Sequence, residues 1–215
     1  MRRSSILLCS GAALLGILGW SPAPVAPAPV PPAPASVATF AGGCFWSMQK
    51  AFDGMAGVTS VTAGFAGGAK ANPTYDDVVS GNTGHAESVE VKFDRTRISY
   101  ERLLDIYWHS IDPLTVDAAF CDHGPQYRSV IFAHDATQRR LAEASKRSLD
   151  TSRRFKTPIV TAIQSAAPFY PAEAYHQQYY RKNPEHYAAY VVGCRREARL
   201  RQLWGDVAIS RGEEK

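Results

Sequence analysis

A proline- and alanine-rich segment at residues 21–36 limits where the folded part of this chain can begin. Proline fixes φ and has no backbone N–H, and its small neighbours leave no large side chains with which to build a core. We expect this segment to be an extended spacer. A domain would then span residues 37–206, with a polar tail at residues 207–215. About 170 residues are enough for one domain with a core of its own.

The segment before the spacer has the pattern of an export signal. Arg2 and Arg3 precede an apolar run at residues 6–20. A basic start followed by about 15 apolar residues is typical of such signals, and the run is shorter than the ~20 residues that cross a membrane as a helix. We expect residues 1–20 to be an export signal or an N-terminal membrane anchor. The protein would then work in the periplasm or be anchored facing it; whether the segment is cleaved stays open.

The charge pattern argues against a nucleic-acid partner. The formal net charge is only +4, and the basic stretch at residues 139–153 contains no aromatic residues. Proteins that bind single-stranded nucleic acids combine basic and aromatic side chains. A solvated helix face explains the stretch better. We therefore expect no nucleic-acid partner. Separately, we expect the protein to be a monomer.

Four cysteines are spread thinly along the chain, at Cys9, Cys44, Cys121 and Cys194. They form no C-x-x-C pair, so a structural zinc site is not expected, and a chain of this length needs no disulfide scaffold. Cys9 lies in the apolar N-terminal run, where we interpret it as incidental. This distribution favours reactive thiols, with buried inert thiols as the alternative.

Hydrophobic periodicity predicts an α+β fold. Strands are predicted at residues 37–40, 58–65, 87–93, 129–133 and 159–164, and helices at residues 45–53, 99–110 and 136–152. A glycine-, asparagine- and proline-rich loop is predicted at residues 67–84, and a helical or irregular tail at residues 172–203. The order β-α-β-β-α-β, followed by α and β, fits a ferredoxin-like split βαβ sandwich.

Cys44 lies between a glycine pair and a predicted helix start, in the run Gly42-Gly43-Cys44-Phe45-Trp46. Glycines allow a sharp turn and the close approach of a ligand. A helix N-terminus carries about half a positive charge, which favours a thiolate. We interpret Cys44 as an activated nucleophile, with a buried structural cysteine as the alternative. Phe45 and Trp46 would be either core residues or the wall of an apolar pocket.

Two further clusters could serve a site. Glu87 begins a predicted strand on the same face as Val89 and Val91, so it is either a buried proton donor with a raised pKa or a solvated strand end. The polar loop at residues 120–128 precedes a strand, as functional loops often do. Within it, the adjacent side chains of Cys121-Asp122-His123 cannot readily close on one ion, so no metal site is expected.

A cysteine–histidine hydrolase would need a base beside Cys44. His85, His123 and His176 are the candidates, and none lies in a diagnostic local pattern. A thiol-dependent acyl hydrolase therefore stays an alternative function.

Six runs of the domain, in order, resemble the type A peptide methionine sulfoxide reductases, which act on the S epimer. They are GGCFW (42–46), GFAGG (64–68), NPTYDDVVSGNTGHAESVEVKFD (72–94), ISYERLLDIYW (98–108), DHGPQYRSVIF (122–132) and FYPAEAYHQQYYRKNP (169–184). The resemblance implies reduction of methionine-S-sulfoxide, free or in oxidised proteins and peptides. It also implies no bound cofactor and an external thioredoxin-like or other dithiol reductant.

The resemblance implies a role for seven residues. Cys44 would attack the sulfoxide sulfur and end as a sulfenic acid, after Glu87 has protonated the sulfoxide oxygen. The other implied roles are a pocket for the S-methyl group (Phe45 and Trp46), hydrogen bonds to the oxygen (Tyr75 and Tyr127) and ordering of the site (Asp122). A catalytically silent module that binds oxidised methionine is the remaining alternative.

The chain departs from the family pattern at Ser47 and Phe65, where glycine and tyrosine are common, and in the loop at residues 116–121. The tail at residues 192–205 departs most, because it reads as a basic helix instead of a glycine-rich coil with recycling cysteines.

This tail leaves open which thiol condenses with the Cys44 sulfenic acid to form a disulfide. Cys194 lies in the expected region, and we favour it as the resolving residue. Cys121 adjoins Asp122 and is the alternative, and an external thiol is the third possibility.

Overall fold

The computed structural model of this chain describes residues 36–206. The predicted export segment, the spacer up to residue 35 and the polar tail at residues 207–215 lie outside the described residues. Within residues 36–206, every helix is too short or too polar to cross a membrane.

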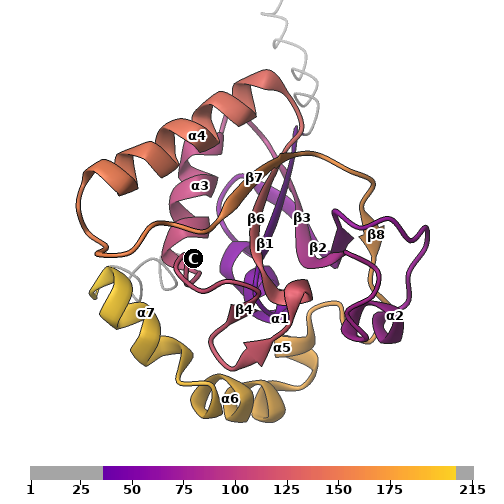
Figure 1. Ribbon diagram of the computed structural model, residues 1–215. Coiled ribbons are helices and arrows are strands. Elements are labelled where there is room, and N and C mark those ends of the chain that lie inside the picture. Colours follow the sequence, from indigo (N-terminus) through magenta and orange to yellow (C-terminus); the bar gives the residue numbers. More distant parts are fainter. Residues whose placement is uncertain (1–35, 207–215) are drawn as a thin grey trace, which may run out of the picture. The chain divides into compact units, whose positions relative to one another are not determined.

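Six strands form one sheet in the order β7-β6-β1-β3-β2-β8 (Figure 1). They are β1 (Ser36–Gly42), β2 (Val58–Ala66), β3 (Ala86–Phe93), β6 (Ser129–Ala133), β7 (Ala162–Ser165) and β8 (Tyr170–Pro171). β3 lies between β1 and β2 and is antiparallel to both, and β6 pairs antiparallel with β1. The order β6-β1-β3-β2 is that of the predicted ferredoxin-like split βαβ fold, which is confirmed. β7 extends the sheet by a parallel pairing with β6.

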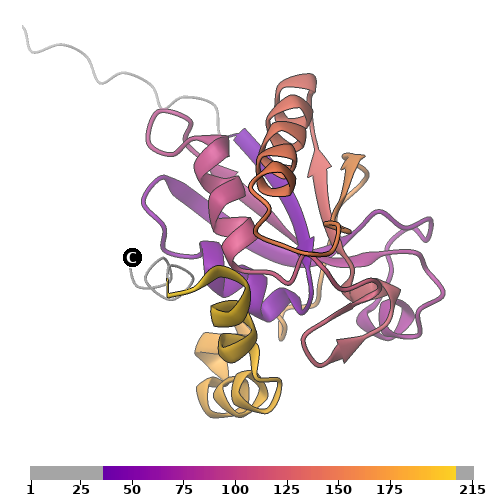
Figure 2. The same cartoon turned by 60° about the vertical axis from the view of Figure 1, so that its left-hand side comes forward.

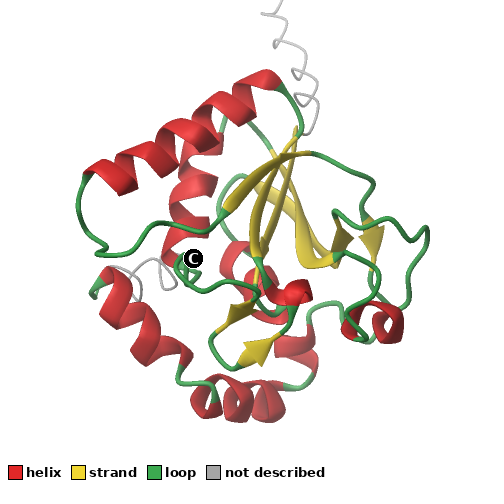
Figure 3. Ribbon diagram, in the orientation of Figure 1, coloured by secondary structure: helices red, strands yellow, loops and turns green. Residues whose placement is uncertain are grey.

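Three helices pack against one face of this sheet: α1 (Phe45–Phe52), α3 (Tyr100–His109) and α4 (Ala136–Thr151). Figure 2 shows α3 and α4 side by side, and Figure 3 distinguishes the helices from the strands. The main core lies between these helices and the sheet and includes Phe40, Phe52 and Tyr107. On the strands, the neighbours of the core residues Phe40 and Ile131 point to the opposite face, where Ala41 and Phe132 belong to a second, smaller cluster.

Local sequence signals set the helix boundaries. Ser99 caps α3 by accepting from the Arg102 backbone N–H at 3.2 Å, and Asp135 caps α4 by accepting from Gln138 at 2.8 Å. The basic stretch that we assigned to a solvated helix face lies on α4 and in the turn after it. Its charges include an i,i+4 ion pair of Arg139 with Glu143, with 3.8 Å between nitrogen and oxygen.

Two predictions need correction. The predicted loop at residues 67–84 contains a short helix, α2 (Tyr75–Val79). The predicted strand at residues 159–164 instead begins at Ala162, because pairing with β6 starts there, opposite Val130. A small hairpin of β4 (Ala118–Ala119) and β5 (Asp122–His123), followed by a 3-10 helix η1 (Pro125–Tyr127), was also not foreseen.

The tail forms three helices, α5 (Tyr179–Lys182), α6 (Pro184–Gly193) and α7 (Arg196–Trp204). Trp204 holds the last of them against the domain. Its ring is 1% exposed, and its indole N–H donates to the Ile111 carbonyl at 3.0 Å. Truncating a buried ring of this size typically costs about 3–5 kcal/mol. The tail is therefore an integral part of the core and can supply residues to a site.

Candidate active site

Cys44 is the N-cap residue of α1 and directly follows the two glycines that join β1 to that helix. Gly43 has a φ of +90°, and a Cβ there would lie 2.6 Å from the Ala119 Cβ. At Gly42, a Cβ would lie 2.3 Å from the Ile111 side chain. Both positions need glycine, Gly42 for close packing and Gly43 also for its backbone angle. The turn buries the Cys44 thiol, which is only 6% exposed.

Glu87 faces the start of α1 from β3. Ala41 pairs with Ser88 across the sheet, so the turn that follows β1 lies beside the Glu87 end of β3. The Glu87 side chain is 1% exposed, and its Oε2 accepts from the Phe45 backbone N–H at 3.0 Å. Burial raises the pKa of Glu87 to about 8; the Phe45 hydrogen bond opposes this rise and the charge of Asp122 adds to it. The carboxyl is therefore mostly protonated at neutral pH and can donate a proton.

The protonation of Cys44 differs from the sequence expectation. Burial raises the pKa of the thiol far above its ordinary value, and the charges of Glu87 and Asp122 raise it further. Hydrogen bonds from the Trp46 backbone N–H and from Tyr190 lower the pKa but do not outweigh burial. The Phe45 backbone N–H, at the start of α1, donates to Glu87. The partial positive charge of the helix N-terminus therefore does not act on the Cys44 sulfur alone. Cys44 rests as a thiol and must lose its proton when it attacks.

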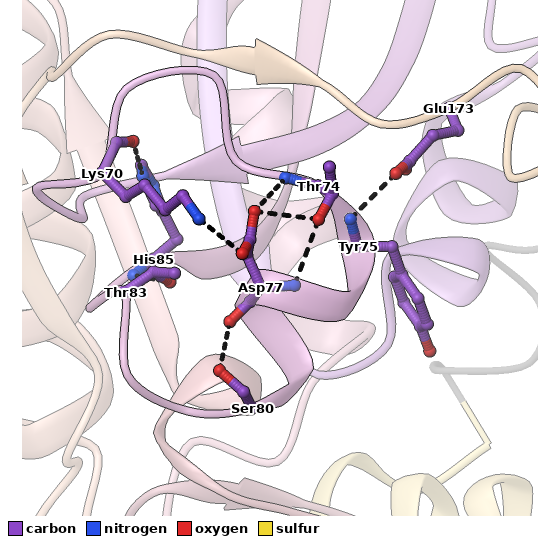
Figure 4. Close-up of polar contacts among 8 residues, drawn as sticks. All are labelled: Lys70, Thr74, Tyr75, Asp77, Ser80, Thr83, His85 and Glu173. Carbon is purple, nitrogen blue, oxygen red and sulfur yellow. Dashed lines mark hydrogen bonds and ion pairs between the residues drawn. The ribbon is translucent and has the colours of Figure 1, made fainter.

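Tyr75 is the first residue of α2, and the local fold fixes its direction. Thr74 and Asp77 form a capping box, and the Tyr75 backbone N–H donates to Glu173 at 2.9 Å. Lys70 also contacts Asp77. Figure 4 shows the Tyr75 ring pointing away from the Thr74–Asp77 network. On its other side, the ring lies 6.3 Å from the Phe45 ring, between centroids.

Tyr127, at the end of η1, is the second predicted phenol of the site. Burial raises the pKa of both Tyr75 and Tyr127, and the charges of Glu87 and Cys44 raise them further. The two phenols therefore stay protonated and can donate hydrogen bonds beside Cys44 and Glu87. Arg128 holds the Tyr127 loop in place, because its guanidinium donates to the Gly84 carbonyl at 2.9 Å.

Asp122, on β5, is connected to the site by a residue that sequence reasoning missed. Tyr190, on α6, donates its hydroxyl to Asp122 Oδ2 at 2.5 Å. Burial raises the pKa of Asp122, while Tyr190 and the charges of Arg196 and His123 lower it. Tyr190 is one of several tyrosines in the tail, and its spacing gave no local signal. Only the position of α6 beside the β4–β5 hairpin brings its hydroxyl to the site.

Phe45 and Trp46 form an aromatic wall beside Cys44. Phe45 is buried and lies 5.8 Å from the Phe65 ring. Trp46 is half-buried and stacks on Tyr179, with 3.8 Å between centroids and 7° between planes. Its indole N–H donates to His176 Nδ1 at 3.1 Å. The wall is apolar and rigid, which suits a methyl group or a thioether.

The two residues near this wall that depart from the family pattern, Ser47 and Phe65, are both accommodated by their neighbours. Ser47, where glycine is common, hydrogen bonds to the Tyr187 hydroxyl at 3.1 Å and so connects α1 to α6. Phe65, where tyrosine is common, is fully buried.

The candidate histidine bases are not arranged for a hydrolase. Both ring nitrogens of His85 are used by loop backbone groups, with Gly68 N–H at 3.1 Å and the Lys70 carbonyl at 2.8 Å. His176 accepts from Trp46, and His123 is exposed on the hairpin. No hydrogen bond joins any of the three to Cys44 among the described residues. The arrangement favours redox chemistry of the thiol over acyl transfer.

The two candidate resolving cysteines are bonded to each other. Cys121 and Cys194 form a disulfide with 4.9 Å between their Cα atoms, while Cys44 is a free thiol. That Cys194, Cys121 or an external thiol condenses with oxidised Cys44 stays a prediction, and the pairing of the two cysteines with each other is a finding of the structure. Cys121 is exposed and Cys194 is half-buried. The disulfide is therefore open to an external reductant.

Within residues 36–206, no three His, Cys, Asp or Glu side chains are placed to hold a metal ion. The chemistry available to this site is that of one buried thiol, a protonated carboxyl, several phenols and an accessible disulfide.

Comparisons with known proteins agree with the resemblance seen in the sequence. The family model for peptide methionine sulfoxide reductase matches residues 36–208. Peptide methionine sulfoxide reductase MsrA of Bacillus licheniformis is 51% identical over 169 residues, which cover 79% of this chain and 93% of the relative. The protein of the same name from Bacillus subtilis is 48% identical, with coverage of 79% and 96%.

Solved structures are similar in fold. Methionine sulfoxide reductase A of Corynebacterium diphtheriae has a TM-score of 0.62 and 32% identity, covering 76% of this chain and 86% of that one. Reduced Mxr1 from Saccharomyces cerevisiae has a TM-score of 0.65 and 29% identity, covering 72% and 90%. The chain belongs to the peptide methionine sulfoxide reductase family, type A, whose members reduce methionine-S-sulfoxide to methionine.

Proposed function

We propose that Cys44 is the nucleophile of this reductase and that Glu87 is its acid. The contact that carries this proposal is the hydrogen bond from the Phe45 N–H to the buried Glu87 carboxyl, at the N-terminus of the helix that Cys44 caps. It puts a protonated carboxyl beside a thiol. A sulfoxide oxygen is a poor leaving group until it is protonated, and protonation also makes the sulfur electrophilic. The pair therefore has the two groups that the reaction needs.

Phenols and the aromatic wall would orient the sulfoxide. Tyr75 and Tyr127 are protonated donors near both Cys44 and Glu87, so they can hold the sulfoxide oxygen. Phe45 and Trp46 offer the apolar surface against which the S-methyl group packs. The Cys44 sulfur then bonds to the substrate sulfur, oxygen passes to Cys44, and methionine leaves a sulfenic acid behind.

The reduced Cys121 and Cys194 pair would reduce the oxidised Cys44 and become a disulfide. One thiol of the reduced pair condenses with the sulfenic acid and releases water. The second thiol of the pair then attacks the sulfur of the cysteine bonded to Cys44, and this thiol–disulfide exchange releases Cys44 as a free thiol. The final disulfide is the one in the structure, and its exposed Cys121 suits attack by a thioredoxin-like dithiol.

The experiment that tests the activity uses the full chain, dithiothreitol and two epimers of a methionine sulfoxide peptide. We expect the S epimer to be consumed and the R epimer to be spared, for the peptide and for free methionine sulfoxide. Consumption of neither epimer would overturn the proposal. An acyl-enzyme adduct formed from an activated ester would favour the hydrolase instead.

We also propose that the protein is exported and acts as a monomer on oxidised envelope proteins. Arg2, Arg3 and the apolar run at residues 6–20 support export, by cleavage or as a membrane anchor. The reductant would then be a thioredoxin-like protein on the same side of the membrane. Recovery of the protein from the cytoplasmic fraction would contradict this location.

A further inference from the structure

A stacked pair of side chains lies next to the Cys121–Cys194 disulfide. The guanidinium carbon of Arg196 lies 4.1 Å from the centroid of the Phe120 ring. Phe120 directly precedes Cys121, and Arg196 follows Cys194 by two residues. The Arg196–Phe120 stack and the disulfide therefore connect the same two segments, the turn of the β4–β5 hairpin and the start of α7.

The same stack borders the segment that carries Cys44. A Cβ built on Gly43, the residue before Cys44, would lie 3.9 Å from Arg196 Nη1 and 4.0 Å from a ring carbon of Phe120. The three cysteine-bearing segments of the described domain thus meet at one guanidinium.

Contacts that do not involve the disulfide hold Arg196 in this position. Arg196 is 5% exposed, and its Nη2 donates to the Ser110 carbonyl at 2.6 Å. One turn further along α7, Arg199 donates to the buried Asp112 carboxylate at 2.8 Å. Reduction of the disulfide breaks none of these bonds, so the guanidinium can stay against the hairpin when the two cysteines are thiols.

The Arg196 guanidinium is costly to bury. Its Nη1 is buried and has no hydrogen-bond partner among residues 36–206. Burying a polar group without a partner is unfavourable, and for a cation the face of an aromatic ring compensates in part. The Phe120 ring is therefore a main stabilising neighbour of this charge, and the two side chains favour each other's position.

The backbone beside both cysteines is in an unusual conformation. Phe120 has a φ of +60°, and Arg195 has a φ of +50°. This left-handed region is unfavourable for residues other than glycine, above all for bulky ones. Without the disulfide, both segments would tend to relax and move the thiols apart. The Arg196–Phe120 stack is placed to oppose that movement.

We propose that Arg196, stacked on Phe120, is a positioning residue that keeps the reduced Cys121 and Cys194 thiols beside each other and close to Cys44. The inference rests on the proposed function, in which this pair reduces the Cys44 sulfenic acid. In that step the two thiols give up two electrons and two protons, Cys44 becomes a thiol again, and its oxygen leaves as water. Holding two thiols together raises the effective concentration of each for the other. The stack therefore favours the disulfide at equilibrium and speeds its formation.

The first measurement is the equilibrium of the pair in mixtures of reduced and oxidised dithiothreitol, with the Cys121–Cys194 disulfide mapped by mass. The variants, made in the full chain, are Phe120→Leu and Arg196→Met. In each we expect the equilibrium constant for disulfide formation to fall on the order of tenfold, which raises the reduction potential by about 30 mV. The double variant should lose little more, because both residues form one contact.

The second measurement is methionine release from fully reduced enzyme with excess S-sulfoxide and no reductant. In Phe120→Leu the first methionine should leave at the wild-type rate, and the second should be slowed on the order of tenfold, because it waits for the pair to restore Cys44. The charge of Arg196 also lowers the pKa of Asp122. The first release is therefore judged in Phe120→Leu, which keeps that charge.

Arg154→Gln is the matched control. The Arg154 guanidinium also lies over an aromatic ring, that of Trp204, at 5.5 Å, and its Nε donates to the Leu203 carbonyl at 2.9 Å. It therefore contacts the end of α7 that is far from Cys194. This variant should keep the wild-type equilibrium constant and both wild-type release rates.

Two results would overturn the positioning role. Wild-type values in Phe120→Leu would show that the stack does not hold the thiols, and equal losses in Arg154→Gln would show that any loosening of α7 has the same effect. A wild-type enzyme that releases no methionine would instead overturn the proposed function, while the dithiothreitol equilibrium would still decide whether the stack positions the pair.

Discussion

Replacing Cys44 with serine is expected to lower sulfoxide turnover by at least ~10³-fold, because a serine hydroxyl cannot attack sulfur and accept its oxygen as a sulfenic acid. The fold should survive, since Cys44 is the N-cap of α1 and serine is among the best N-cap residues. The measurement is the rate of S-epimer consumption with dithiothreitol, together with circular dichroism of the variant.

Cys121→Ser is the control for Cys44→Ser. It removes another thiol but leaves the attacking one, so dithiothreitol should still support turnover by reducing Cys44 directly. If Cys44→Ser stayed active while Cys121→Ser lost activity, the nucleophile would have to be reassigned to the hairpin.

Glu87→Gln is expected to lower the maximal rate by about 10²–10⁴-fold, the range for loss of a general acid. Glutamine keeps the size of the side chain and can still accept from the Phe45 N–H, so the site should keep its shape. The wild-type pH profile gives a second check. Because the pKa of Glu87 is raised to about 8, the donor form is present below that pH and is lost above it. Activity that depends on this proton should therefore fall as pH rises through about 8.

Glu90→Gln is the matched control for Glu87, because residue 90 lies on the same strand but on its other face. It should retain the wild-type rate and the wild-type alkaline limb. Equal losses in both variants would mean that the strand tolerates no such change and that Glu87 has no special role.

The sequence predicts the parts of this fold that repeat locally. Alternation located β3, and the apolar character of their runs located β2 and β6, each within about a residue; the glycine pair with Cys44 located the turn before α1. The missed α2 is only five residues long and too short for periodicity, although its Thr74–Asp77 capping box was present in the sequence. The displaced β7 depends on its pairing with β6, which is a tertiary property.

The chemistry of the site was less accessible from the sequence. The helix position of Cys44 favoured a thiolate, but burial and two neighbouring carboxyls reverse that expectation. The Cys121–Cys194 pairing spans 73 residues, and only the docking of the tail brings the two thiols together. The same docking brings in Tyr190. The tail, which departs most from the family pattern, therefore carries both the disulfide partner of Cys121 and the phenol that donates to Asp122.

The central claim is that Cys44 carries out the reaction and that the Cys121–Cys194 pair then takes up the oxidation. The most direct test mixes fully reduced enzyme with excess S-sulfoxide, without reductant, counts the methionine released and maps the disulfides by mass. We expect about two methionines per enzyme, because transfer of the first oxidation to the pair frees Cys44 for a second attack. The Cys121–Cys194 disulfide should accumulate, and Cys121→Ser or Cys194→Ser should release about one. Two methionines from either single variant, or a wild-type enzyme that stops at one with Cys44 in a stable disulfide, would contradict the account.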